Sequence, residues 1–181
     1  NNQMSDEITN KGLCGTGVAF KVMQAIDNQL DIKYSRKFIS YVWLANVSDS
    51  VPFTHSEQYT FAKWGRKYIH KNLQPFIDEW CEGKLDNKTI AWKLTPKFNS
   101  LIRLGTLEDK QELFQALCGE IDPSNIISKC KSYHTKQQAQ SKQMIEDVEI
   151  VNNSSVVIGR LTEKTTMTGL IAGKLMSKYN K

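Results

Sequence analysis

Apolar residues recur at helical spacing in one segment after another from Gly15 to about Ile145, and this pattern constrains the fold more than any other feature of the chain. A helix is predicted from Gly15 to about Gln29, and a second from Ser35, a good N-cap, to about Asn46. Further helices are predicted over residues 56–70, 75–82, 87–92, 107–117 and 124–145, with a break at Pro96. The last of these is polar toward its end, which is typical of a helix that bridges two packed bodies.

The pattern changes after residue 146. Residues 148–151 and 155–158 are rich in Val and Ile, and they indicate two strands joined by a turn at 152–154. A last helix is predicted from Met167 to Tyr179. The expected fold is therefore a mainly α-helical body with a small α/β C-terminal portion.

Composition excludes several classes of protein. The chain has 181 residues, of which 40% are hydrophobic, enough to form a core. No apolar run reaches the roughly 18 residues of a membrane span, so no membrane partner is expected. The chain opens without Met and without the apolar segment of a signal peptide, and we expect it to be a piece of a longer protein. Its cysteines, at positions 14, 81, 118 and 130, are spaced like neither a zinc site nor a disulfide framework. We expect buried thiols in a reducing, cytoplasmic compartment.

The net charge of +5 is concentrated in the middle of the chain. Residues 1–32 have a net charge of −2, residues 33–105 of +6 and residues 106–181 of +1. A local positive excess suits a polyanionic partner such as nucleic acid, although many basic faces are only solvated surface.

Within this region, five basic side chains recur at the spacing of one helix face, a suitable arrangement for contacting successive phosphates. They are Lys63, Arg66, Lys67, His70 and Lys71. The alternative is a solvated face opposite Tyr59, Ala62 and Tyr68.

Three further features have both a functional and a plain structural interpretation. Asp49 follows an apolar helix at a turn, so it is either a metal ligand or a turn residue, and a divalent ion needs several ligands. Lys97, Asn99 and Arg103 either contact phosphates and sugars or belong to an ordinary amphipathic helix. The Gly15-x-Gly17 segment favours close helix packing over phosphate binding, because it lacks a third glycine and a preceding strand.

Taken in order, four segments resemble the RecJ-type single-strand-specific exonucleases of the DHH phosphoesterase superfamily. Gly12-Leu-Cys-Gly-Thr-Gly-Val-Ala-Phe-Lys21 is similar to the family's Gly-x-Gly-Val-Ala-Phe-Lys segment, and Leu44-Ala-Asn-Val-Ser-Asp-Ser-Val-Pro52 to its Leu-Gly-Thr-Val-Ala-Asp-x-Val-Pro. The stretch 94–105 resembles Gly-Pro-Arg-Ile-Asn-Ala-Ala-Gly-Arg-Leu-Gly, and the stretch 168–175 resembles a helix start in the DHH-associated domain. Departures, such as Ile102 for a glycine and Lys164 for a histidine, indicate a divergent relative, of phage or prophage origin.

The resemblance implies a fragment of a two-lobed α/β nuclease. Residues 1–53 would close the catalytic lobe, 54–145 would connect the lobes, and 146–181 would open the associated domain. Asp49 is the counterpart of one ligand in the family's manganese or magnesium site, whose other ligands, including the Asp-His-His motif, do not occur here. The basic residues named above are candidates for binding nucleic acid, and the resemblance adds Lys164, Thr166 and Gly169 to them.

The resemblance therefore implies part of a metal-dependent exonuclease of single-stranded DNA, or of RNA, which is inactive without the missing catalytic lobe. Two alternatives remain open at this stage. One is a helical nucleic-acid-binding or adaptor module without hydrolytic activity. The other is a DHH-type phosphodiesterase of small nucleotides or oligoribonucleotides.

Overall fold

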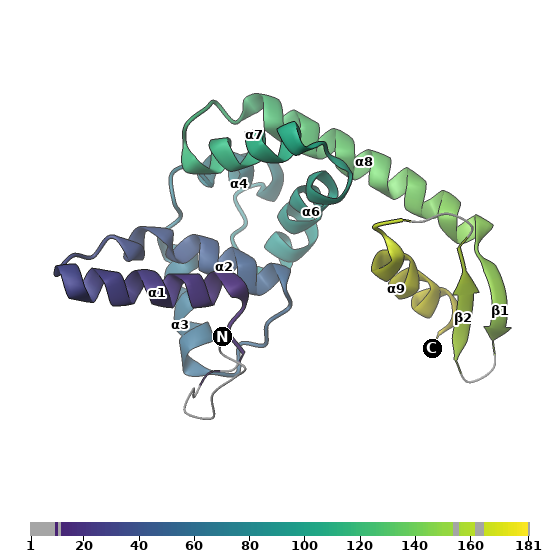
Figure 1. Cartoon of the computed structure of the whole chain (residues 1–181), viewed down its shortest axis with the longest axis horizontal. Coiled ribbons are helices and arrows are strands. Elements are labelled where there is room, and N and C mark those ends of the chain that lie inside the picture. Colours follow the sequence, from purple (N-terminus) through teal and green to yellow (C-terminus); the bar gives the residue numbers. More distant parts are fainter. Residues whose placement is uncertain (1–9, 11, 154–155, 162–164, 181) are drawn as a thin grey trace. The chain divides into compact units, whose positions relative to one another are not determined.

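The computed structural model describes residues 10, 12–153, 156–161 and 165–180 (Figure 1). It is mostly helical, with a small two-stranded antiparallel sheet near the C-terminus, so the predicted fold class is confirmed. The chain divides into two compact units, Asn1–Pro96 with Gln115–Pro123, and Lys97–Phe114 with Ser124–Lys181. The divisions predicted after residues 53 and 145 concern lobes of a parent nuclease and stay a prediction. None of the described helices combines the length and the apolar composition that crossing a membrane requires.

Helices form the first unit. They include α1 (Gly15–Leu30), the short 3₁₀ helix η1 (Ser35–Phe38), α2 (Ile39–Ser48), α3 (Ser56–Lys67) and α4 (Gln74–Cys81). A core cluster of Phe20, Val42 and Phe61 joins α1, α2 and α3, with the two phenylalanine rings 5.6 Å apart and edge to face. This arrangement fixes α3, the helix with the predicted basic residues, against the rest of the unit.

The prediction that Ser35 caps the second helix is wrong. Its backbone N–H and hydroxyl both donate to Asp27 Oδ2, at 2.8 and 2.6 Å. Ser35 is buried and opens η1, and α2 begins only at Ile39. Because a buried carboxylate needs donors, it binds the serine hydroxyl that would otherwise have been available to a helix N-terminus.

The predicted break at Pro96 is also wrong. The helix α5 (Asn87–Thr89), capped as predicted by Asp86, leads into a π-helical segment, η2 (Ile90–Leu94), and then directly into α6 (Thr95–Leu104). Thr95 donates its backbone N–H to Ile90 O, five residues earlier. A proline in a helix lacks an N–H and clashes with the carbonyl four residues earlier, and the wider π turn accommodates both defects.

In the second unit, α7 (Leu107–Cys118) starts with a reciprocal capping box. Thr106 N–H donates to Asp109 Oδ2 at 3.1 Å, and Asp109 N–H donates to Thr106 Oγ1 at 3.3 Å. Asp109 also accepts hydrogen bonds from Lys129 and Tyr133 of α8 (Ser124–Asp147), at 2.8 and 2.6 Å. The pKa of Asp109 is held well below its ordinary value of 3.8, mainly by the hydrogen bond from Lys129 and then by that from Tyr133. The same carboxylate therefore caps the start of α7 and ties this helix to α8.

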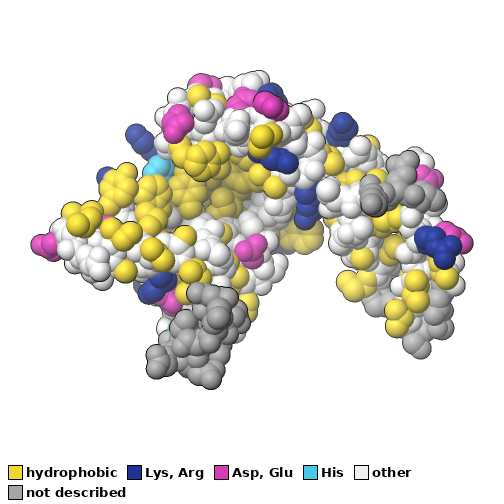
Figure 2. Space-filling view, viewed as in Figure 1, with side chains coloured by type: hydrophobic (Ala, Val, Ile, Leu, Met, Phe, Trp, Pro, Cys, Tyr) yellow, Lys and Arg dark blue, Asp and Glu magenta, His cyan; other side chains and the backbone are white. Residues whose placement is uncertain are grey.

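The C-terminal part of this unit is a hairpin covered by a helix. Strand β1 (Glu149–Asn153) pairs antiparallel with β2 (Val157–Arg160), and α9 (Thr168–Tyr179) follows. Met167, Ile171 and Leu175 form its buried core. Figure 2 shows hydrophobic side chains exposed over the hairpin and α9, and again over α1 and α2.

The expectation of four buried thiols holds for three of them. Cys14, Cys81 and Cys130 are buried, whereas Cys118 is exposed at the end of α7, and none of the four forms a disulfide. Burial raises the pKa of Cys130 to about 12, which makes this thiol inert at neutral pH.

Candidate nucleic-acid interface

Helix α3 has a basic C-terminal half and an acidic start. His55 Nδ1 accepts the N–H of Glu57 at 3.3 Å, and Glu57 lies in the first turn. Arg66 and Lys67 occupy the last turn, where cations stabilise the negative end of the helix dipole. The sequence therefore gathers positive charge at one end of this helix.

Gly65 lets α3 approach α2 closely. A Cβ at this position would lie 3.0 Å from Ile39 O and would overlap Trp43 Cβ. Trp43 is fully buried, and its Nε1–H donates to Asn87 Oδ1 at 2.8 Å, so it is held in place. With Gly65 on the inner face, the neighbouring residues of α3 project toward the surface.

Two of these neighbours form an aromatic pair surrounded by cations. The rings of Trp64 and Tyr68 are stacked, with centroids 5.6 Å apart and planes at 11°. Lys67 Nζ lies 5.2 Å from the Trp64 centroid and 5.3 Å from that of Tyr68, and Lys63 Nζ lies 5.6 Å from Trp64. Tyr68 is 53% exposed. Cations beside aromatic rings that reach the surface are one arrangement with which proteins hold unpaired bases and their phosphates.

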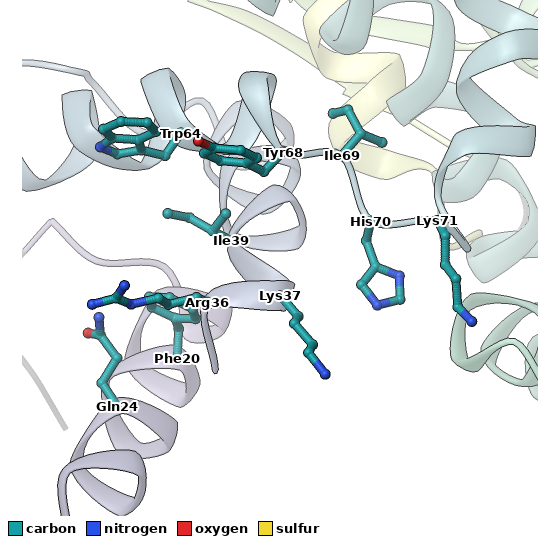
Figure 3. A pocket seen from close by; sticks show the side chains of 10 residues that line it. All are labelled: Phe20, Gln24, Arg36, Lys37, Ile39, Trp64, Tyr68, Ile69, His70 and Lys71. Carbon is teal, nitrogen blue, oxygen red and sulfur yellow. The ribbon is translucent and has the colours of Figure 1, made fainter. Parts of the chain in front are cut away.

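A pocket of about 940 Å³ lies beside this pair (Figure 3). Trp64 and Tyr68 lie along one side, Phe20 and Arg36 lie across from them, and Ile39 lies between. Lys37, His70 and Lys71 line its other end, and Gln24 and Ile69 complete the lining. Arg36, Lys37 and Lys71 are cationic, and none of the described lining residues is acidic, so the pocket favours an anion with an apolar body.

His70 enters this pocket as a neutral group. Its ring stacks on Phe38, with centroids 5.4 Å apart, and its Nδ1 accepts the backbone N–H of Asn72 at 3.3 Å. Burial, followed by the charges of Lys71 and Lys37, lowers the pKa of His70 from its ordinary value of 6.5. At neutral pH the proton therefore lies on Nε2, and His70 is a hydrogen-bond donor rather than a charge.

The predicted basic face is only partly formed. Lys63, Arg66 and Lys67 are exposed on α3 as predicted, but the helix ends at Lys67, so His70 and Lys71 lie beyond it. The expectation that Tyr68 lies on the opposite face is wrong, because its ring stacks on Trp64 among the cations. Tyr59 is exposed too, at 63%, and only Ala62 of that set is buried.

The candidates of the second unit lie on two helices. Lys97, Asn99 and Arg103 belong to α6, where Arg103 is exposed and Lys97 is half-buried. Burial, followed by the nearby charge of Lys97, lowers the pKa of His134. Thr166 and Gly169 are exposed at the start of α9, and Lys164 lies outside the described residues.

Asp49 lies at the C-terminal end of α2 with its carboxylate exposed, and its backbone N–H donates to Ala45 O at 2.9 Å. Within the part of the chain that the structure describes, no three His, Cys, Asp or Glu side chains come together as a metal site. The residues present therefore do not by themselves fit a divalent ion, and Asp49 supplies at most one ligand.

Sequence reasoning missed Arg36, Lys37 and Trp64. The signal that could have found Trp64 is the run Lys63-Trp64-Gly65-Arg66-Lys67-Tyr68, in which aromatic residues are interspersed among basic ones. Arg36 and Lys37 lie far from this run in the sequence and join it only because α2 packs on α3.

Comparison with known proteins relates the chain to proteins of phages and prophages. YorK of Bacillus subtilis (strain 168), derived from the SPbeta prophage, is 27% identical over 211 aligned residues, which cover all of this chain and 36% of YorK. Its counterpart in Bacillus phage SPbeta matches to the same extent. Both are assigned as single-strand DNA-specific exonucleases. The chain thus spans about a third of the length of the curated relatives it matches. No protein-family model matches the chain.

Proposed function

We propose that this chain is part of a metal-dependent exonuclease of the RecJ type, acting on single-stranded nucleic acid, and that its own contribution is to bind the strand. The observation that supports this most directly is the surface of α3, where Lys63 and Lys67 lie over the stacked rings of Trp64 and Tyr68. Single-stranded nucleic acid combines an anionic backbone with bases that stack, so it matches both features at once.

The relatives support the nuclease part of the proposal, because they are assigned as single-strand DNA-specific exonucleases. The four segments that resemble the RecJ-type enzymes support the membership in that group. Manganese or magnesium belongs to the proposal as well. Asp49 would supply one ligand, and the other ligands would come from parts of the complete nuclease beyond the described residues.

The first experiment uses the 181-residue chain alone. It is expected to bind a labelled single-stranded oligonucleotide and to release no nucleotides from it in the presence of manganese, because Asp49 lacks co-ligands. Release that depends on manganese would show a complete active site in this chain and would contradict the proposed division of roles.

The second experiment changes Asp49 in the complete nuclease. Asp49→Ala is expected to lower exonuclease activity by orders of magnitude and to leave folding intact, because the carboxylate is exposed. Asp78→Ala, which removes an exposed carboxylate from α4, is the matched control and should retain activity. Wild-type turnover by Asp49→Ala would remove Asp49 from the metal site.

A further inference from the structure

We infer that the pocket between α3 and the start of α2 holds one nucleotide unit of a single strand, with its base against Trp64 and Tyr68 and its phosphates at Arg36, Lys37 and Lys71. This inference rests on the proposed function, and it assigns a particular contact to residues outside the four segments that resemble known nucleases.

Charge sets the first requirement on the ligand. Arg36, Lys37 and Lys71 all line the pocket, and no carboxylate does so among the described residues. None of the three forms an ion pair with a described acidic side chain. Lys37 Nζ lies 4.5 Å from the Tyr34 ring centroid, a contact that leaves its charge uncompensated. Cations without such ion pairs around one cavity favour an anionic ligand, and Arg36 can bind a phosphate through two parallel hydrogen bonds.

The rings set the second requirement. Trp64 and Tyr68 lie nearly parallel, at 11°, on one side of the pocket, while Phe20 and Ile39 contribute apolar surface (Figure 3). A flat ring with an apolar face fits this geometry, and a base in a duplex is unable to present its face in this way. Anionic groups joined to flat rings are the chemistry of a nucleotide in a single strand.

The pocket has few groups that could read a base. Its uncharged polar groups are those of Gln24 and His70, the Tyr68 hydroxyl and the Trp64 indole N–H, and His70 offers a single donor at Nε2. Stacking is possible for every base, whereas discrimination needs paired donors and acceptors on the base edge. We therefore expect binding with little preference for base sequence. The volume of about 940 Å³ is at the upper end of the roughly 300–1,000 Å³ of ligand pockets, which leaves room for a nucleotide.

The helix itself supplies a matched control. Tyr59 and Tyr68 are both tyrosines of the α3 region and are 63% and 53% exposed, but only Tyr68 lines the pocket. Replacing either with alanine removes an exposed ring at little cost to folding. A difference between the two variants therefore reports on the pocket and not on the general loss of a surface aromatic.

The test measures the affinity of the 181-residue chain for a labelled oligothymidylate and for an abasic oligomer of equal length by fluorescence anisotropy. Tyr68→Ala is expected to weaken oligothymidylate binding about tenfold, or about 1.4 kcal/mol, which is a typical loss for one stacked base. It should leave the abasic oligomer unaffected, because that oligomer has no base to stack. Tyr59→Ala should match the wild type with both oligomers. Lys71→Gln should weaken both oligomers equally, while Lys88→Gln, an exposed lysine outside the pocket, should have less effect on either.

Two results would overturn the inference and leave the proposed function intact. One is that Tyr68→Ala binds oligothymidylate as tightly as the wild type does. The other is that Tyr68→Ala loses affinity for the abasic oligomer to the same extent as for oligothymidylate. That second result would mean that the pocket does not bind a base and would suit another anionic ligand, such as an acidic protein segment. Failure of the wild-type chain to bind either oligomer would overturn the proposed function itself.

Discussion

Replacing Gly65 with alanine should separate α3 from α2 and so disturb the wall of the pocket. The new Cβ would overlap Trp43 Cβ and lie 3.0 Å from Ile39 O. Neither atom is the far end of a flexible side chain, because one is backbone and the other is the root of a fully buried indole. The helix must therefore move as a whole to relieve the contact.

Two opposing effects set the size of the change. Alanine in a helix interior is more favourable than glycine by about 1 kcal/mol. Overpacking a well-packed site costs roughly 1–3 kcal/mol, and the upper end applies because the neighbours of Gly65 are rigid. The expected net loss in the free energy of unfolding is about 2 kcal/mol, which corresponds to a decrease in Tm of about 4–8 °C for a chain of this size.

The control is Gly173→Ala on α9, where a Cβ would meet nothing within 4 Å. That variant should be more stable than the wild type by about 0.5–1 kcal/mol, since only the helix propensity changes. Thermal unfolding followed by circular dichroism compares both variants with the wild type. If Gly65→Ala melts at or above the wild-type temperature while Gly173→Ala is stabilised as expected, the close approach of α3 to α2 is not a constraint and the reasoning fails.

Two further predictions concern the second unit. Asp109→Asn should lower the free energy of unfolding by about 1.5–3 kcal/mol at pH 7, because it weakens the charged bond to Lys129. Since folding lowers the pKa of Asp109 below 3.8, its contribution is present above that pH and declines below it, so urea titrations at pH 7 and pH 3 should show a smaller difference at pH 3. In the complete nuclease, Arg103→Ala should weaken single-strand binding by roughly 1.5–3 kcal/mol, more than Lys97→Ala, and less so at high salt. Unchanged affinity of Arg103→Ala at low and high salt would make α6 a scaffold.

The sequence was sufficient for elements whose signals are local. The hairpin was predicted at 148–151 and 155–158 and lies at 149–153 and 157–160, because runs of β-branched residues around a turn need no distant contact to be recognised. Asp86 caps its helix as predicted, with Oδ1 accepting Thr89 N–H at 2.7 Å. The limits of α8 and α9 follow from helical spacing in the same way.

Two local signals failed because another interaction took the same atoms or relieved the same steric clash. Ser35 is a good helix cap in isolation, yet its hydroxyl donates to Asp27, a residue that only the fold brings near. Pro96 normally ends a helix, but the π turn at Ile90–Leu94 lets α6 continue through it.

The candidate site divides in the same way. The sequence by itself determined that α3 would be a helix with Lys63, Arg66 and Lys67 exposed, since spacing along one helix fixes which residues share a face. Only the tertiary structure decided that Arg36 and Lys37 would join Trp64 and Tyr68 around one pocket. That arrangement depends on the packing of α3 against α2 across Gly65, and the free energy of such a contact comes from residues that are remote in the sequence.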